Sequence, residues 1–270
     1  MNELQVAQEA ARAGGQIVAR YFREGVTMRT HHQSYNLVSD ADVESELAIV
    51  RVIKDAFPDH SVLAEEAHKD DPGAPHLWVI DPLDGTTNFA HRNPHFAVSI
   101  AYYRHGQPSC GVVYNPVRGE WFVAARGQGA FYNGDCQRVS DRQRLDEALI
   151  GVGFYYPRGP MLTATLDSVQ DLYAHQIHGI RRFGSAALEL CQVGTGMLDA
   201  YFEFELAPWD FAAGRLFVEE AGGMVTTCCG GPLPLAKTSV LASNGPLHEA
   251  ILSVIRPHSL RSDADQASKT

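Results

Sequence analysis

The sequence predicts an α+β fold, and three features of the chain lead to that prediction. Residues 2–24 and 40–56 carry apolar side chains at close to helical spacing. Residues 96–132 contain β-rich runs separated by turn-like segments, a pattern typical of an antiparallel meander. After Gly151, helical and strand-like segments alternate. The chain therefore combines an antiparallel first half with an alternating second half.

The first half begins with two helices, at residues 2–24 and 40–56. Ser39 is expected to cap the second helix, with Asp42 in its first turn. Residues 61–66 and 76–81 are expected to be strands, and both runs end in acidic residues. The meander follows in three runs, "FAVSIAYY", "SCGVVYN" and "EWFVAA", joined by "RHGQP" and "PVRG".

The second half alternates between helices and strands. Helices are predicted near 161–175 and at 185–198, 209–223 and 246–255, and strands at 180–184, 199–206 and 239–244. A chain of 270 residues lies near the upper limit for one hydrophobic core. We predict a single domain over 1–260, with halves of roughly 1–145 and 146–260, and a flexible tail at 261–270.

Composition restricts the class of protein. The formal net charge is -10 and no basic run is longer than Arg181–Arg182, which argues against general nucleic-acid binding. The five cysteines form no CxxC pair, so reduced thiols and a cytoplasmic location are expected. No apolar run approaches the roughly 20 residues of a membrane span, and the acidic, amphipathic start resembles neither a signal nor a transit peptide.

Acidic residues recur where apolar elements stop. Glu65 and Glu66 follow "SVLA", Asp81 and Asp84 follow "LWVI", and Asp210 follows "LAPW". Each group alone has an ordinary structural explanation: a solvated loop, a turn, or an acid that satisfies a helix dipole. Four carboxylates within ~4 Å of one another would repel by about 4 kcal/mol per pair at an effective dielectric of 20. Hard divalent cations remove that penalty, so the set predicts a Mg²⁺ site.

The residues after Asp84 indicate what such a metal would act on. Gly85, Thr86 and Thr87 can begin a short helix, whose backbone N–H groups and dipole favour a phosphate oxygen. An ordinary helix-capping turn is the alternative explanation. No G-x-x-x-x-G-K-[ST], strand-linked G-x-G-x-x-G, G-x-S-x-G or H-E-x-x-H motif is present. "DADVE" at Asp40 lacks the Thr or Val of an aspartyl nucleophile, so a metal-activated water is preferred.

These motifs together resemble the inositol monophosphatase family. The resemblance rests on "EE" at 65–66, "WVIDPLDGTTNF" at 78–89 and "WDFAAGRLFVEEAGG" at 209–223, and it covers the chain except the tail. Bacterial members that carry "PWDFAAG" look nearest. The resemblance implies a layered αβαβα sandwich of the inositol monophosphatase and sugar phosphatase type. It also implies Mg²⁺-dependent phosphomonoester hydrolysis, inhibition by lithium, and usually a homodimer.

The resemblance further implies a set of metal ligands. Glu65, Asp81 and the carbonyl of Leu83 would bind the activating metal. Asp81, Asp84 and Asp210 would bind the second metal, which steadies the leaving oxygen. Glu65 would also help to hold a third ion. Two to three Mg²⁺ ions are therefore expected per site, and Mn²⁺ is an alternative.

Catalytic and phosphate-binding roles are implied in the same way. Thr86, with Asp42 and a water molecule, would align the nucleophile, so Glu65, Thr86 and Asp42 are the predicted catalytic residues. The amides of Gly85 and Thr86 would hold the phosphate. In many relatives a lysine lies in the loop before the segment that matches Leu37–Asp42. The matching position in this chain is His31, which puts the binding of the third ion in question.

Contacts to the substrate alcohol would come from Asp84, Ala186 and Glu203. A cyclic polyol with adjacent hydroxyls suits these groups, so myo-inositol monophosphate is the first expected substrate. Glu203 has an alternative explanation as an exposed strand residue. Relatives with the same metal core act on fructose 1,6-bisphosphate, histidinol phosphate or 3′-phosphoadenosine phosphates, and the metal motifs do not separate these substrates.

A second hypothesis is a regulatory protein on the same fold that binds RNA or a transcription partner. The complete metal set favours the enzyme. A local basic face around Arg138, Arg142 and Arg144 would favour RNA binding, but a solvated loop is the simpler explanation of these arginines. No membrane partner is expected.

Overall fold

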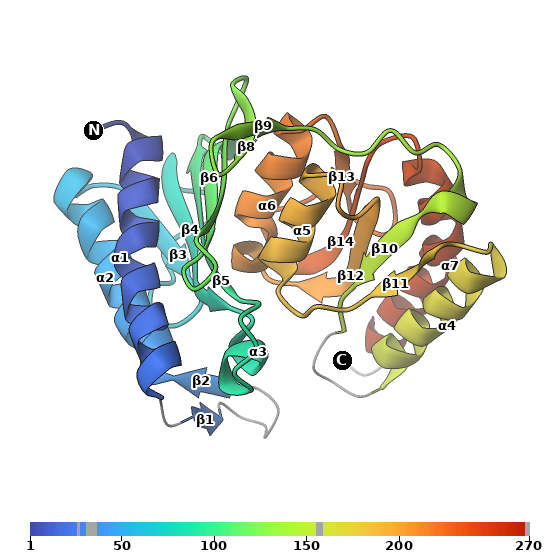
Figure 1. Ribbon diagram of the computed structural model, residues 1–270, viewed down its shortest axis with the longest axis horizontal. Helices are drawn as coiled ribbons and strands as arrows, with labels where there is room; N and C mark the ends of the chain where they lie inside the picture. The colour runs from blue at the N-terminus through green and yellow to red at the C-terminus, as the bar shows by residue number, and fades with distance from the viewer. Residues whose placement is uncertain (26–27, 31–36, 155–158, 268–270) are drawn as a thin grey trace.

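The chain folds into five alternating layers of helices and sheets. The computed structural model describes residues 1–25, 28–30, 37–154 and 159–267. In Figure 1 the layers follow one another from left to right, which confirms the predicted α+β sandwich. The helical layers are α1 (Glu3–Glu24) with α2 (Asp40–Ala56), then α5 (Ala186–Gly194) with α6 (Pro208–Glu220), then α4 (Pro160–Ala174) with α7 (His248–Ala267).

The first sheet has seven strands in the order β3-β4-β5-β6-β7-β8-β9. Its strands are β3 (Ser61–Ala64), β4 (His76–Asp84), β5 (Ala97–Arg104), β6 (Gln107–Asn115), β7 (Glu120–Ala125), β8 (Gly129–Tyr132) and β9 (Asp135–Gln137). From β4 onward every neighbouring pair is antiparallel, as the meander predicted. Only the β3–β4 pair of this sheet is parallel, and this pair matters for the site.

The second sheet has five strands in the order β11-β10-β12-β14-β13. They are β11 (Gly179–Arg181), β10 (Leu149–Val152), β12 (Ala200–Leu206), β14 (Thr238–Ser243) and β13 (Met224–Thr226). Strands β11, β10 and β12 are parallel, and the other pairs are antiparallel. The sequence did not predict β9, β10 or β13. These strands are three or four residues long, too short for a clear period-2 pattern.

Smaller elements complete the described chain. A hairpin joins β1 (Met28–Thr30) to β2 (Leu37–Ser39), α3 (Thr86–Ala90) follows β4, and the 3₁₀ helix η1 (Leu145–Glu147) precedes β10. The predicted helix 185–198 ends at Gly194, because Gly196 adopts a left-handed conformation just beyond it. The predicted strand 180–184 ends at Arg181. Helix α7 continues to Ala267, into the predicted tail.

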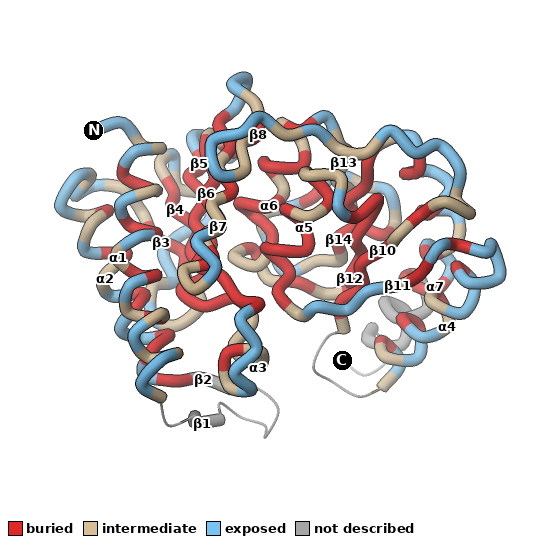
Figure 2. The backbone as a smooth tube through the Cα atoms, viewed as in Figure 1, coloured by how far each residue is buried: buried red, intermediate tan, exposed pale blue. Residues whose placement is uncertain are grey.

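Buried residues line the contact of α5 and α6 with the sheets on either side of them (Figure 2). Gly111 in β6 permits this packing, because a Cβ there would lie 3.1 Å from the Ala213 backbone of α6. Ser39 caps α2 as predicted, and Asp42 completes a capping box with it. No helix within the described residues is both long enough and apolar enough to span a bilayer.

Candidate active site

The parallel pairing of β3 with β4 brings the first acidic residues together. Ala64 lies opposite Ile80, so Glu65 and Asp81 come next at the same edge of the sheet. The β4–β5 register shifts between Asp81 and Asp84, and all four residues from Asp81 to Asp84 are buried. Asp81 and Asp84 are 1% and 8% exposed. The acids at the end of this core strand are therefore held inside the protein.

The third aspartate comes from the other half of the chain. Asp210 occupies the first turn of α6, and its Oδ2 accepts a hydrogen bond from the Ala207 amide at 2.7 Å. One carboxylate oxygen from each of Asp81, Asp84 and Asp210 lies within 4.8 Å of the others. This distance is short enough for a single cation to contact all three residues. Helix α6 thus joins a carboxylate of the second half to two from the first.

Backbone and hydroxyl donors hold these three carboxylates in place. Asp81 Oδ1 accepts from the Leu83 amide at 2.9 Å, and Asp84 Oδ2 accepts from the Ala187 amide at 2.8 Å and from the Ser185 hydroxyl. Among the described residues, the hydrogen bonds of Asp81, Asp84 and Asp210 engage one oxygen of each. The second oxygen remains available to a cation. Buried, hard oxygen donors of this kind fit Mg²⁺.

The electrostatics of the cluster also indicate that it requires a bound cation. Burial, followed by the charges of Glu65, Asp84 and Asp210, raises the pKa of Asp81 well above its usual range. Burial and then the charge of Asp210 raise the pKa of Glu65 in the same direction. Burial also raises the pKa of Asp84 to about 6, opposed by the donors of α5. Without a cation, the carboxylates destabilise one another.

All five predicted metal-binding residues line one cavity. Its volume is about 360 Å³, and its walls include Glu65, Asp81, Leu83, Asp84 and Asp210. Glu65 lies in this wall but outside the compact group of three aspartates. The cavity is also lined by Gly85, Thr86, Ala207, Pro208, Trp209 and Lys237. Lys237 forms an ion pair with Glu205.

Thr86 and Asp42 meet beside this cavity. The Thr86 hydroxyl lies 3.1 Å from the Leu83 carbonyl oxygen and 3.4 Å from Asp42 Oδ1. Asp42 is 1% exposed, its Oδ2 accepts from the Ser39 amide and hydroxyl, and burial raises its pKa to about 6. Gly85 precedes α3 with a φ of 94°, where a Cβ would lie 3.1 Å from the His95 carbonyl oxygen.

The predicted substrate contacts line a second, adjoining pocket. Asp84, Ala186 and Glu203 all face a pocket of about 110 Å³ that shares Asp84, Gly85 and Asp210 with the cavity. Glu203 is 8% exposed and accepts a hydrogen bond from the Tyr201 hydroxyl at 2.6 Å. Glu203 is therefore not the exposed strand residue of the alternative explanation. Burial raises its pKa to about 8.

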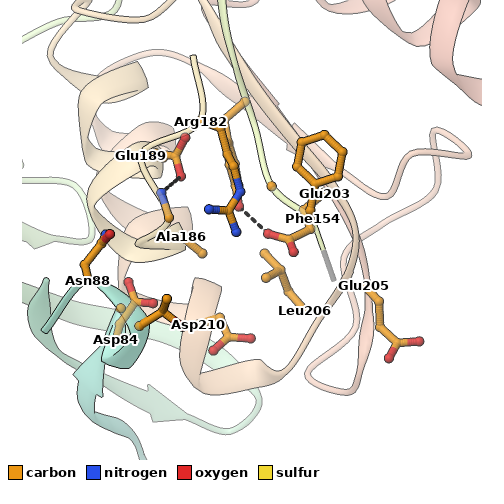
Figure 3. Close-up of a pocket in the computed structure, with 15 residues that line it drawn as sticks. Asp84, Asn88, Phe154, Arg182, Ala186, Glu189, Glu203, Glu205, Leu206 and Asp210 are labelled. Atoms are coloured by element: carbon orange, nitrogen blue, oxygen red, sulfur yellow. Dashed lines mark hydrogen bonds between the residues drawn. The ribbon is translucent and has the colours of Figure 1, made fainter. Parts of the chain in front are cut away.

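Sequence reasoning missed several residues of this pocket. Figure 3 shows the guanidinium of Arg182 extending into it, above Asp84 and Asp210 in that view. Glu189 of α5 is fully buried and accepts from the Gly184 amide at 3.0 Å and from the Phe183 amide. A glutamate at a core-facing position of an apolar helix was the one available signal. Arg182 stands in "RR", a pattern that indicates a short basic run and does not by itself indicate a pocket residue.

Two further predictions from the sequence concern His31 and the basic face. His31 is outside the described residues. Of the three arginines proposed as a basic face, Arg142 pairs with the fully buried Asp199 at 2.9 Å and Arg144 pairs with Asp146. These ion pairs engage two of the three charges within the protein itself.

Comparisons with known proteins identify the family. A model of the inositol monophosphatase family matches residues 2–260. Nus factor SuhB of Pseudomonas aeruginosa is 41% identical over 262 residues, covering 94% of this chain and 96% of that protein. The structure of an Anabaena inositol monophosphatase is 39% identical, covering 93% of this chain and 94% of that chain, with a TM-score of 0.83.

A structure of the Staphylococcus aureus enzyme SaIMPase-II with inositol monophosphate bound is 29% identical, covering 99% of this chain and 100% of that chain, with a TM-score of 0.85. These matches extend over nearly the whole chain, including both acidic motifs. The chain belongs to the inositol monophosphatase family of metal-dependent phosphatases.

Proposed function

We propose that this protein is a Mg²⁺-dependent phosphomonoesterase that hydrolyses a small polyol phosphate, with myo-inositol monophosphate as its substrate. The observation that carries the proposal is the group of three aspartates, two buried and Asp210 partly buried, in which one carboxylate oxygen of each lies within 4.8 Å of the others. The group borders a pocket lined by further hydrogen-bonding side chains. A small phosphate ester of a polar alcohol requires a cation-binding site for its phosphate and an adjacent polar pocket for its alcohol.

The proposed metal ligands follow the cavity wall. Glu65, Asp81 and the Leu83 carbonyl hold the first Mg²⁺, and Asp81, Asp84 and Asp210 hold the second. Glu65 contributes to a third ion. The same oxygen donors accept Mn²⁺, and lithium inhibits by competing at this site. The raised pKa values support these assignments, because they reflect burial first and then mutual repulsion, and bound cations would offset both.

Bound divalent cations supply an activated water at neutral pH and neutralise charge on the phosphate and leaving oxygen. The protein supplies the geometry. Asp42 and Thr86 form a polar pair beside the cavity that orients the attacking water, and the Gly85 and Thr86 amides hold the phosphate. The Thr86 hydroxyl lies within hydrogen-bond distance of the Leu83 carbonyl and of Asp42 Oδ1, and these two acceptors hold it in place. No covalent intermediate on the protein is required.

Asp84, Ala186 and Glu203 form the proposed alcohol site. Glu203 presents a buried acceptor, and Ala186 leaves room for a ring beside Asp84. The S. aureus relative with inositol monophosphate bound supports this substrate. Fructose 1,6-bisphosphate, histidinol phosphate and 3′-phosphoadenosine phosphates remain the competing substrates, because all of them present the same phosphate to the metals.

Phosphate release from that panel of esters tests the proposal. We expect release only with Mg²⁺ or Mn²⁺ present, inhibition by lithium, and the highest kcat/KM for inositol monophosphate. A preference for another ester would change the proposed substrate and leave the proposed phosphatase activity in place. Hydrolysis that persists in chelator would contradict the proposed metal site. The proposed homodimer is checked separately by light scattering in solution.

A second candidate function is suggested by the relative named Nus factor SuhB. We propose that a role with RNA or a transcription partner coexists with hydrolysis on the same fold. The net charge of -10 and the engaged Arg142 and Arg144 disfavour direct RNA contact. Filter binding of RNA across a salt titration distinguishes the alternatives: specific retention supports an RNA role, and its absence leaves a protein partner, which is tested by capture with purified transcription factors.

A further inference from the structure

Glu46 is a buried carboxylate outside the proposed metal ligands. It lies on α2 and is 1% exposed. Among the described residues, its hydrogen bonds all come from residues 66–68. Its Oε2 accepts from the Glu66 amide at 2.7 Å, and its Oε1 accepts from the amides of Ala67 at 2.9 Å and His68 at 3.2 Å. The His68 imidazole Nδ1 lies 2.7 Å from the same Oε1.

The segment held by Glu46 begins immediately after Glu65. Three consecutive backbone amides converge on one carboxylate, and together they determine where the chain turns after β3. From the other side, the Lys69 ammonium donates to the Glu65 carbonyl at 2.6 Å and lies 4.3 Å from the centre of the Trp209 ring. Glu65 is thus attached to a turn whose backbone is fixed at both ends.

Glu46 belongs to a polar face of α2 that contacts the segments carrying Glu65, Leu83 and Thr86. Asp42, Ser45 and Glu46 occupy positions i, i+3 and i+4, which share one face of a helix. Asp42 approaches Thr86, and the Ser45 hydroxyl donates to the Pro82 carbonyl at 3.0 Å. This one helical face therefore contacts the ends of β3 and β4 and the start of α3. Buried polar groups on a core-facing helix are costly unless they form hydrogen bonds, and the side chains of Asp42, Ser45 and Glu46 all do.

We propose that Glu46 is a positioning residue that holds the Glu66–His68 turn, and through it sets the Glu65 carboxylate at the metal cavity. The proposal rests on the proposed function, because it requires Glu65 to be a metal ligand. Glu46 does not line the cavity itself. Its effect on the metals therefore passes through the turn. Partners that orient metal ligands typically change metal affinity by about 10- to 100-fold when they are replaced.

A purely structural role is the alternative, and the chain offers a matched control for it. Asp199 is also fully buried and also accepts from several donors: the Leu149 amide at 2.7 Å, the Ser140 hydroxyl and the Arg142 guanidinium. It lies before β12 and does not line the cavity. Replacing Asp199 should lower stability as much as replacing Glu46, without reaching Glu65.

The experiment measures Mn²⁺ binding by titration calorimetry on the full chain, together with the thermal unfolding midpoint in chelator. Four proteins are compared: wild type, Glu46→Gln, Glu65→Gln and Asp199→Asn. Glutamine must turn an NH₂ group towards an amide donor, so the turn shifts. We expect E46Q to weaken Mn²⁺ binding about tenfold or more, close to E65Q. We expect D199N to lower the unfolding midpoint and leave the Mn²⁺ affinity unchanged.

The outcomes separate the two levels of the proposal. If E65Q leaves Mn²⁺ binding unchanged, the proposed ligand set is wrong. If E65Q weakens binding and E46Q does not, or if D199N weakens it as much as E46Q, the positioning role is overturned. If a variant does not fold, His68→Ala and Ser140→Ala form a milder pair, since each removes one donor from Glu46 or Asp199. H68A alone should then weaken Mn²⁺ binding, and equal affinities in both would contradict the proposal.

Discussion

The carboxylate cavity and the adjoining alcohol pocket share Asp84, Gly85 and Asp210, yet their acidic residues are compensated differently. In the cavity, burial is the largest cause of the raised pKa of Asp81, and three neighbouring carboxylates add to it. In the pocket, Glu203 accepts a hydrogen bond from the Tyr201 hydroxyl, and Glu189 accepts hydrogen bonds from two backbone amides. The cavity therefore needs cations from solution, whereas the pocket is largely satisfied by the protein.

This difference separates chemistry from selectivity. Groups in the cavity should control whether the ester is hydrolysed at all, because they bind the ions that supply the reactive water. Groups in the pocket should control which alcohol is accepted, since they form hydrogen bonds with hydroxyls. Four measurements, from the largest expected effect to the smallest, test whether the two regions divide the work in this way.

The largest effect is expected from Asp210→Asn. It removes a charge from the group of three aspartates while keeping an oxygen that can accept from Ala207. A metal contributes several kcal/mol of charge stabilisation, so turnover should fall on the order of 10³-fold. Phosphate release and metal titration measure the loss. Circular dichroism in chelator should show an unchanged fold and an unfolding midpoint no lower than that of wild type. Unchanged hydrolysis would rule out this ligand.

Thr86→Ala should lower kcat by about 10²-fold with little change in KM, because the hydroxyl acts on the water and not on substrate binding. Thr195→Ala is the matched control. The Thr195 hydroxyl also donates to a carbonyl, that of Gln192, at 3.1 Å, but at the end of α5. Steady-state kinetics of both variants decide the matter. A pure KM effect in T86A would assign Thr86 to binding instead.

Glu203→Gln should change selectivity more than chemistry. Above about pH 8, where Glu203 is ionised, a hydrogen bond to this charged acceptor contributes about 1.5–3 kcal/mol, so kcat/KM for inositol monophosphate should fall by roughly 10- to 100-fold. Hydrolysis of a simple aryl phosphate, which has no alcohol hydroxyls, should change little. The ratio of the two kcat/KM values is the measurement. An equal loss for both esters would place Glu203 in the chemistry and remove the distinction between the regions.

The smallest effect is a pH dependence of stability, to which the raised pKa values of the pocket and of the metal-free cavity contribute in the same direction. Burial raises the pKa of both Glu189 and Glu203 from 4.5 to about 8. Between these values the folded protein binds more protons than the unfolded chain, so the free energy of unfolding should fall as pH rises from about 5 through 8. Urea denaturation in chelator measures this slope. E203Q should make it shallower, and a flat wild-type profile would contradict the raised pKa values.

Several parts of the fold and site were predictable because their signals are local. Helices α1 and α2 follow from apolar spacing, the cap of α2 from Ser39, and the meander from its turn residues. The four acids of the cavity wall were found from motifs in which an apolar run stops at an acid, whereas its lysine, Lys237, was not. The parallel pairing of β3 with β4 was not predicted, since pairing direction depends on how the connecting chain crosses the sheet.

The residues that hold the site were not predictable from local patterns. Glu46 looks like any charged residue in an amphipathic helix, and only its contact with a turn some twenty positions later distinguishes it. Arg182 and Glu189 enter the pocket because α5 packs against the first sheet and its start anchors Asp84. No spacing rule in the sequence connects residues that meet only when two layers pack.

The sequence by itself determined the fold class, the family and the acids that line the cavity, because these depend on contiguous motifs and on side-chain periodicity. The tertiary structure decided which carboxylates come within reach of one ion, which acids are satisfied by the protein, and which helix face holds Glu65 in place. The physical reason is that burial and mutual repulsion are properties of distances in space. Those distances are set when α2, α5 and α6 pack around the ends of β3 and β4.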